Sequence, residues 1–256
     1  MAKRVLITAG ASGIGAAMAR AFAAAGASVW IADIDAAAVA ACPPTWRSDA
    51  LDVADESAVA DLFARVGAAW GGLDVLCANA DIAGPTAPVE DVALGAWPRC
   101  VSVNLEGAFL AAKHAVPMMK RQRSGAVILT SSTAGLFGYP NRAPYAAAKW
   151  AINGLMKTLA MELGPFGIRA NSICPGAVEG PRIEAVLARE AAAKGTTRDA
   201  IYEGYAAGTS MRSFVTAEDV AAIAVFLGSD AARLVSGQII AVDGHTENPD
   251  PKVPAR

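Results

Sequence analysis

Three side chains in the second half of the chain have the types and spacing to move a proton on and off an alcohol oxygen. Tyr145 and Lys149 stand four residues apart at the start of a helical pattern, so both lie on one helix face. A free phenol ionises only near pH ~10, and a neighbouring ammonium would favour the phenolate that acts as a base. Ser132, at the end of a strand pattern, could hydrogen-bond the same oxygen. A Tyr-x-x-x-Lys pair alone is more often a surface helix with an aromatic and a charge, so the surrounding elements decide its meaning.

A glycine-rich segment near the start of the chain could bind a phosphate group. The strand-like run 4–8 leads into Ala9 to Gly15, and an alanine-rich helical pattern follows. Glycines let a pyrophosphate approach the amides that open the helix, and the helix N-terminus favours negative charge. We expect this contact to be made by Gly10, Ser12, Gly13, Ile14 and Gly15. The segment therefore predicts a dinucleotide-binding turn.

Asp33 bears on which dinucleotide would bind. It ends the next strand pattern, eighteen residues beyond Gly15. A carboxylate there can accept both hydroxyls of an adenosine ribose and would repel a 2′-phosphate. Ile34 follows it, so no cation stands beside it in sequence, and the pattern favours NAD over NADP. The alternative is that Asp33 merely solvates a strand end. Asp52 and Val53, after a short third strand, could offer a carboxylate and an amide to the adenine.

Strand and helix patterns alternate along the chain, which is typical of a mostly parallel sheet with helices on both faces. The expected strands are Val5–Thr8, Ser28–Ala32, Thr45–Leu51, Asp74–Ala78, Ala126–Ser131, Arg169–Cys174 and Gln238–Val242. The expected helices are Ile14–Ala25, Glu56–Trp70, Trp97–Arg121, Tyr145–Leu163, Arg182–Lys194 and Ala217–Leu227. The predicted fold class is α/β, with one Rossmann-like domain over residues 1–256 and a doubly wound, mostly parallel seven-stranded sheet flanked by helices. Ser132 and the glycine-rich segment then share the carboxyl edge, where open α/β sheets bind ligands.

The composition argues against several other classes of protein. The net charge is −2 with no basic stripe, which disfavours nucleic acid as a partner. No run of eighteen or more apolar residues lacks Arg, Asp, Glu or Lys, which argues against a membrane span. A strand that begins at about residue 4 leaves no room for a signal peptide, and the four scattered cysteines lack metal-binding spacing. We therefore expect a cytoplasmic protein with reduced thiols, no metal and a small-molecule substrate.

Taken together, the motifs resemble the classical short-chain dehydrogenase/reductase family over nearly the whole chain. The matching residues are, in order, Thr8 with Gly13-Ile14-Gly15, Asp52-Val53, Asn79-Ala80, Val103-Asn104-Leu105, Ser132, Tyr145 to Lys149, Pro175-Gly176, and Gly237-Gln238 with Val242-Asp243-Gly244. Several ordered motifs at family spacing are far more specific than any single one.

The resemblance implies a role for each matching residue. Tyr145 would be the acid/base, Ser132 would orient the substrate oxygen, and Lys149 would bind the nicotinamide ribose and favour the phenolate. Asn104 would hold a water that links Lys149 to solvent. The cofactor would also touch Asn79, Ala80, Tyr145, Pro175, Gly176 and Val178. A homotetramer is implied as well, built through the helices that contain Trp97 and Tyr145 and through the last helix and strand.

Four residues depart from the family pattern. Ala9 stands where the first glycine of the loop is usual, so the turn must accept a methyl group. Asp81 replaces the glycine after Asn79-Ala80 and places a carboxylate near the cofactor. Gly180 replaces a threonine that is common after the Pro-Gly motif, and His245 replaces the second glycine after Asp243. None of these changes removes a proton-transfer group.

The substrate side of the expected site is less defined. Segment 178–212 lies where the family places its substrate-covering loop and helices. Arg182 is the first candidate to meet a polar or anionic substrate such as a sugar, polyol or hydroxy acid. Arg142, Glu179 and His245 are weaker candidates for the same pocket. The polar tail 247–256 is expected either to be loose or to dock on a neighbouring subunit.

These patterns predict an NAD-dependent oxidoreductase that interconverts a secondary alcohol and a ketone. One alternative is a 3-oxoacyl-thioester reductase, a class that typically prefers NADPH, against which Asp33 argues. A cyclic-alcohol dehydrogenase is another. A catalytically silent dinucleotide-binding regulator is the alternative outside enzymes, but such proteins commonly lose the tyrosine or the lysine, and both are present here.

Overall fold

The protein is built on a seven-stranded, fully parallel sheet in the order β3-β2-β1-β4-β5-β6-β7. The computed structural model describes residues 2–247. Its strands are β1 (Arg4–Thr8), β2 (Ser28–Asp33), β3 (Arg47–Ala50), β4 (Val75–Ala78), β5 (Gly125–Thr130), β6 (Ile168–Pro175) and β7 (Ile239–Val242). The predicted fold class and all seven predicted strands are thereby confirmed. Of the predicted polar tail, only Glu247 lies within the described residues.

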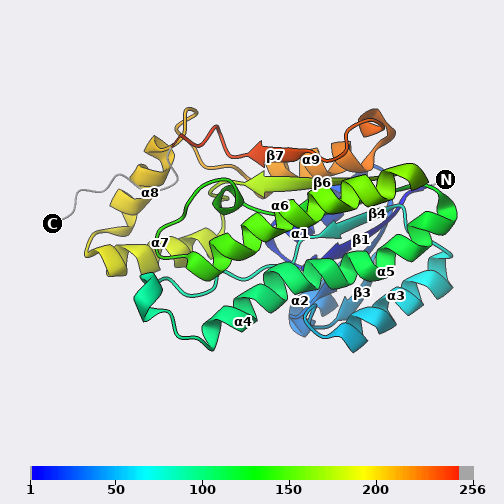
Figure 1. Cartoon of the computed structure of the whole chain (residues 1–256), viewed down its shortest axis with the longest axis horizontal. Coiled ribbons are helices and arrows are strands. Elements are labelled where there is room, and N and C mark those ends of the chain that lie inside the picture. Colours follow the sequence, from blue (N-terminus) through cyan, green and yellow to red (C-terminus); the bar gives the residue numbers. More distant parts are fainter. Residues whose placement is uncertain (1, 248–256) are drawn as a thin grey trace.

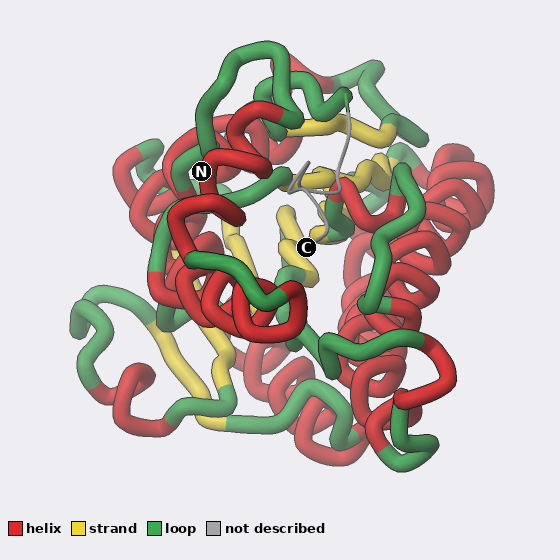
Figure 2. Tube along the Cα trace, turned by 90° about the vertical axis from the view of Figure 1, so that its left-hand side faces the viewer, coloured by secondary structure: helices red, strands yellow, loops and turns green. Residues whose placement is uncertain are grey.

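Helices cover both faces of the sheet (Figure 2). On one face lie α1 (Gly13–Ala24) and α9 (Ala217–Gly228), and on the other lie α3 (Glu56–Trp70), α5 (Gly107–Gln122) and α6 (Ala143–Leu163). Short helices α2 (Ala36–Ala40) and α4 (Ala96–Val101) flank them. Beyond the carboxyl ends of the strands lie α7 (Pro181–Lys194) and α8 (Arg198–Ala207), at the left of Figure 1. None of the helices within residues 2–247 has the length and apolarity needed to cross a membrane.

The strands read as nearly continuous apolar runs because both faces are covered. In β1, Leu6 packs toward α3, α5 and α6, whereas Val5 and Ile7 pack toward α1 and α9. In β5, Leu129 and Ile128 divide between the same two faces. The alternation is the period-2 geometry of a strand, and it fixes the register of each strand against both helix layers. The carboxyl edge of the sheet is therefore a rigid platform for the loops that follow each strand.

The helix predicted over 97–121 is present as one unbroken helical run, but it contains a π-helical turn that the sequence did not predict. The chain forms α4, then a π-helical turn at Ser102–Glu106, and only then α5. Inside the π turn, the side-chain oxygen of Asn104 accepts the backbone N–H of Ile82 (2.7 Å), and its nitrogen donates to the Ile82 carbonyl (3.0 Å). Such insertions often mark functional sites. Here the widened turn accompanies a buried amide that clamps the loop after β4.

Helix α8 was also missed, because charged residues hide its short apolar face. Thr197 caps it by accepting the N–H of Ala200 (3.2 Å), and Ile201 and Tyr205 are buried against α7. The predicted capping box of α9 is confirmed, since Thr216 and Asp219 bond to each other's backbone N–H groups.

Gly135 sets how closely α6 approaches the end of β5. It ends a short 3-10 turn, Thr133–Gly135, that packs against α6. A Cβ atom at Gly135 would lie 2.6 Å from the Lys149 carbonyl oxygen and 2.5 Å from Ser131 Oγ. The same Ser131 hydroxyl donates to that carbonyl at 2.8 Å. A glycine is therefore needed here for close approach between the helix and the strand end.

Gly135→Ala is expected to destabilise the fold by about 1–3 kcal/mol, because the added methyl must push backbone atoms apart. Thermal unfolding measures this as a lower Tm. Gly138→Ala is the matched control, because nothing lies within 4 Å of a Cβ there and its φ is not left-handed. Equal Tm values for the two variants would contradict this account of the contact.

Candidate active site

The site lies at the carboxyl edge, where the strand order reverses between β1 and β4. Polar side chains tie the ends of three strands together there. Thr8 Oγ1 accepts the backbone N–H groups of Asn79 (2.9 Å) and Ala80 (3.1 Å), and Asn79 Oδ1 accepts from Thr130 Oγ1 (3.1 Å). Ligands of open α/β sheets bind at such a reversal point. These contacts fix the predicted Asn79 and Ala80 after the end of β4, and Asn79 lines the cavity described below.

The glycine-rich loop has the shape that a dinucleotide requires. Gly13 has φ +49° and opens on free space, whereas a Cβ at Gly15 would lie 1.9 Å from the Ala9 carbonyl oxygen. Ser12 caps α1 without using its side chain on the helix. Ser12, Gly13 and Ile14 line the cavity described below. The residues predicted for the phosphate contact therefore fit that group, which would be held at the N-terminus of α1.

The structure explains why Ala9 can stand where the family's loop usually has its first glycine. Ala9 takes φ +50°, the left-handed region that a glycine would occupy without strain. Gly10 must stay a glycine for packing, because a Cβ there would lie 2.6 Å from Ile31 Cβ. The turn thus accepts the methyl group of Ala9, as expected, and uses Gly10 for contact with β2.

Asp33 is buried at the end of β2, with 7% of its surface exposed. Its carboxylate accepts the N–H groups of Ala11 (3.0 Å) and Asp35 (3.2 Å), which joins it to the glycine-rich loop. A strand-end aspartate that only solvates itself would not be buried or bonded in this way. The position is suited to hydroxyls of a ribose bound against the loop.

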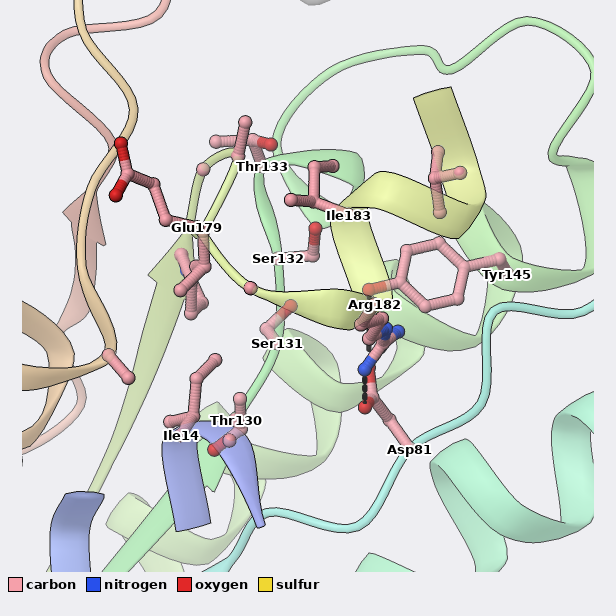
Figure 3. Close-up of a pocket in the computed structure, with 18 of the residues that line it drawn as sticks. Ile14, Asp81, Thr130, Ser131, Ser132, Thr133, Tyr145, Glu179, Arg182 and Ile183 are labelled. Atoms are coloured by element: carbon pink, nitrogen blue, oxygen red, sulfur yellow. Dashed lines mark hydrogen bonds and ion pairs between the residues drawn. The ribbon is translucent and has the colours of Figure 1, made fainter. Parts of the chain in front are cut away.

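Ser132 and Tyr145 line one cavity of about 450 Å³ (Figure 3). Lys149 is fully buried, its Nζ donates to the Thr130 carbonyl (2.9 Å), and it lies 5.5 Å from the centre of the Tyr145 ring. Ser132 Oγ accepts the N–H of Ala134 (3.1 Å), which leaves its own proton free to donate into the cavity. The predicted proton-transfer residues are therefore brought together.

Asp81 joins this group, which sequence reasoning flagged only as a departure. Its Oδ2 lies 3.3 Å from the Tyr145 hydroxyl and 3.3 Å from Lys149 Nζ. Its two oxygens also accept a bidentate contact from Arg182, 2.8 Å for Nη2 to Oδ2, drawn dashed in Figure 3. Burial alone would raise the pKa of Asp81, but Lys149 and Arg182 hold that pKa well below its usual range. Asp81 is therefore an ionised carboxylate beside the Tyr145 hydroxyl.

Arg182 reaches this network from α7, across the cavity. Burial opposes its charge, yet Asp81 and Tyr145 raise the pKa of Arg182 above its ordinary value. Its side chain is 49% exposed, while that of Asp81 is only 12% exposed. Arg182 therefore neutralises a buried carboxylate beside the tyrosine, and its guanidinium is not free to meet a substrate unless that pair opens.

Comparison with known proteins identifies the family. A family model described as enoyl-(acyl carrier protein) reductase matches residues 8–245. The cis-4-hydroxycyclohexanecarboxylate dehydrogenase of Sinomonas cyclohexanicum is 39% identical over 250 residues, covering 95% of this chain and 96% of its own. The D-beta-hydroxybutyrate dehydrogenase of Rhizobium meliloti (strain 1021) is 34% identical over 254 residues, covering 95% and 98%. A crystal structure of NAD+-bound xylitol dehydrogenase superposes with a TM-score of 0.91 at 28% identity, covering 94% and 98%.

The chain belongs to the short-chain dehydrogenase/reductase family. The resemblance read from its motifs is confirmed. The relatives named above are dehydrogenases of hydroxyl groups, and the chain is accordingly an oxidoreductase that acts on secondary alcohols.

Of the other expected cofactor residues of this dehydrogenase, some line the cavity and others have partners outside it. Pro175, Gly176 and Val178 line the cavity after β6. Asp52 accepts the N–H of Ala54 (2.9 Å) and forms an ion pair with Arg99 (2.9 Å), while Val53 is buried against Gly107 of α5. The side-chain nitrogen of Asn104 donates to the Ile82 carbonyl and to Cys100 Sγ (3.3 Å). The water expected on Asn104 would therefore have to bind a different atom of this residue.

The substrate candidates divide into two groups. Arg142, Glu179 and Arg182 line the cavity. His245 does not: it is exposed, has φ +63°, and its Nδ1 lies 2.6 Å from Ser210 Oγ. Gly180, at the start of α7, has φ +137°, a backbone conformation that a threonine would adopt only with strain.

Sequence reasoning missed an aromatic wall of the cavity. The hydroxyls of Tyr139 and Tyr205 contact each other, and Tyr205 donates to the buried carboxylate of Glu190 (2.8 Å). Burial first, and then the neighbouring Tyr139 and Glu190, raises the pKa of Tyr205, which keeps it protonated. The position of Tyr139 in the loop between Ser132 and Tyr145 was the signal that could have identified it.

The charges around Tyr145 predict a change in the pH profile of alcohol oxidation. The phenol is faced by Lys149 and Arg142 of α6, Asp81 after β4 and Arg182 of α7. Arg182→Gln leaves the charge of Asp81 less compensated, which disfavours the phenolate and moves the rising limb of activity to higher pH. Because Arg182 is half exposed, we expect a shift of about one pH unit or less.

Asp81→Asn removes the negative charge and should move the same limb in the opposite direction, to lower pH. The measurement is kcat/KM against pH for both variants and for the double variant, which should return toward the unsubstituted protein. Shifts of the same sign in the two single variants would rule out this charge balance.

Proposed function

We propose that the protein is an NAD-dependent dehydrogenase that oxidises the secondary alcohol of a small polar compound reversibly to a ketone. The observation that carries the proposal is that Ser132 and Tyr145 line one cavity beside the glycine-rich loop, with the buried Lys149 ammonium 5.5 Å from the centre of the Tyr145 ring. A dinucleotide-binding regulator would not need this arrangement of proton-transfer groups.

The residues divide the chemistry among themselves. When bound, the nicotinamide ring would accept the hydride from the carbinol carbon. Tyr145, as phenolate, takes the hydroxyl proton, and Ser132 donates a hydrogen bond that steadies the reacting oxygen. Lys149 supports the phenolate and would bind the nicotinamide ribose, and Asn104 would hold the water that carries the proton from Lys149 to solvent. Oxidation is the proposed working direction.

NAD is the proposed cofactor because of Asp33. Its buried carboxylate faces the place expected for the ribose hydroxyls, and the next residue, Ile34, offers no charge to a 2′-phosphate. The likeness to an NAD+-bound xylitol dehydrogenase supports the same choice. This preference argues against a 3-oxoacyl-thioester reductase, the alternative nearest to the description of the matching family model.

Among polar substrates, a hydroxy acid is favoured over a sugar or polyol. Two of the relatives act, by name, on a hydroxycyclohexanecarboxylate and on a hydroxybutyrate. The substrate named for the first of these is both a cyclic alcohol and a hydroxy acid. A cyclic hydroxy acid is therefore one of the proposed substrates.

The proposed assembly is a homotetramer that acts in the cytoplasm. Large apolar side chains are exposed on the two surfaces expected to pair: Trp97, Phe109, Trp150 and Met161 on α4, α5 and α6, and Phe226 and Ile239 on α9 and β7. All four cysteines are free thiols, which fits a reducing compartment. Light scattering on the purified chain measures the assembly directly.

Tyr145→Phe should lower kcat/KM for alcohol oxidation by about a hundredfold or more, because the acid/base oxygen is lost. The assay follows reduced nicotinamide across sugars, polyols, hydroxy acids and cyclic alcohols. Tyr202→Phe is the matched control, since Tyr202 packs on Phe214 and does not line the cavity. A Tyr145→Phe enzyme with undiminished turnover would refute the proposed role.

Asp33→Asn should reduce the preference for NAD over NADP by about tenfold or more, because the repulsion of a 2′-phosphate is removed. The measurement is the ratio of kcat/KM values for the two cofactors. Asp35→Asn, two residues on, is the control, because asparagine caps α2 as well as aspartate does. An unchanged ratio in Asp33→Asn would count against the carboxylate as the determinant.

A further inference from the structure

Arg142 is a buried guanidinium without a carboxylate partner. It stands at the N-cap of α6, only 4% exposed, and it lines the cavity. Its Nη2 donates to the Ala83 carbonyl (2.9 Å), but its Nε has no hydrogen-bond partner. No ion pair formed among the described residues includes Arg142.

Such a group is unusual in a folded protein, because buried charges are normally paired. The faces of Tyr145 and Tyr139 lie 4.9 Å and 5.8 Å from the guanidinium carbon and offset part of the desolvation by cation–π attraction. They do not engage the in-plane N–H donors of the guanidinium, of which one on Nη2 is used by Ala83 and that on Nε has no partner. Those donors match the two oxygens of a carboxylate.

The other two cations near the tyrosine share one carboxylate as a partner. Arg182 and Lys149 both contact Asp81. Among the described residues that line the cavity, Arg142 is therefore the cation that lacks a counter-ion. An anion that enters the cavity gains most by meeting Arg142, since meeting Arg182 would first require the pair with Asp81 to open.

We propose that Arg142 binds the carboxylate of a hydroxy-acid substrate while the substrate hydroxyl meets Tyr145 and Ser132. The inference rests on the proposed dehydrogenase function and names the substrate group that the site selects. Arg142 is then a specificity residue: it anchors one end of the substrate beside the phenol that exchanges the proton.

The test compares each acid with its uncharged amide, using the full chain and NAD. The probes are 3-hydroxybutyrate and cis-4-hydroxycyclohexanecarboxylate, each beside the corresponding carboxamide. The unsubstituted enzyme should prefer the acid, and in Arg142→Gln the ratio of kcat/KM for the acid to kcat/KM for the amide should fall by about tenfold or more, mainly through the KM of the acid. Arg142→Lys should retain part of the preference. Arg20→Gln, at an exposed pair with Glu218, is the control and should behave as the unsubstituted enzyme.

A binding readout separates recognition from turnover. Cyclohexanecarboxylate lacks the hydroxyl, and it should raise the Tm of the unsubstituted protein more than cyclohexanecarboxamide does. That difference should vanish in Arg142→Gln. Arg182→Gln should keep the difference in Tm, because Arg182 is paired with Asp81 and is not the proposed carboxylate site.

The outcomes distinguish this inference from the function on which it rests. If neutral alcohols are oxidised with NAD but acid and amide are equivalent in the unsubstituted enzyme, the carboxylate site is wrong and the dehydrogenase stands. If acid and amide fall together in Arg142→Gln, the residue only holds the loop through Ala83, and the inference is overturned. If no alcohol is oxidised at all, the proposed function fails. Should Arg142→Gln not fold, the acid-to-amide comparison in the unsubstituted enzyme still decides.

Discussion

The carboxylate of Asp81 joins helix α6, the loop after β4 and helix α7 into one charge network. Without it, Lys149 and Arg182 would face each other beside Tyr145 as two cations with no anion between them. Without Arg182, the carboxylate would oppose the phenolate that Lys149 favours. The network is therefore balanced only when α7 lies over the cavity, so the covering segment and the proton-transfer group are electrostatically coupled.

The balance depends on backbone placement that the sheet supplies. Thr8, Asn79 and Thr130 bond across three strand ends, so the loop that carries Asp81 leaves a fixed platform. Asn104 holds the next residue of that loop, Ile82, from the π turn before α5. Gly135 lets α6 approach closely enough for Lys149 to reach the end of β5. These contacts position Asp81 and Lys149 so that their charged groups can pair.

The sequence could predict what depends on local pattern. Seven strands, the glycine-rich turn and the pairing of Tyr145 with Lys149 follow from apolar periodicity and short spacings. It could not predict the Asp81–Arg182 pair, because those residues are 101 positions apart and meet only after α7 folds over the sheet edge. The π turn was hidden for a similar reason, since its partner is the backbone of Ile82. Nor could the sequence predict that His245 lies outside the cavity, in contact with Ser210 and Asp243, because no motif signals those contacts.

The two arginines of the cavity show why residue type alone does not assign a role. Arg182 is the first cation of segment 178–212 and the obvious one for an anionic substrate, yet it is already paired with Asp81. Arg142 is less conspicuous in sequence, at the start of the catalytic helix, but it is buried and unpaired. A buried charge that the fold leaves without a counter-ion costs stability, and a ligand that supplies the counter-ion recovers that cost on binding. Selectivity for a carboxylate then arises because the folded chain provides no counter-ion for Arg142. In the same cavity, Asp81 is the counter-ion of Arg182.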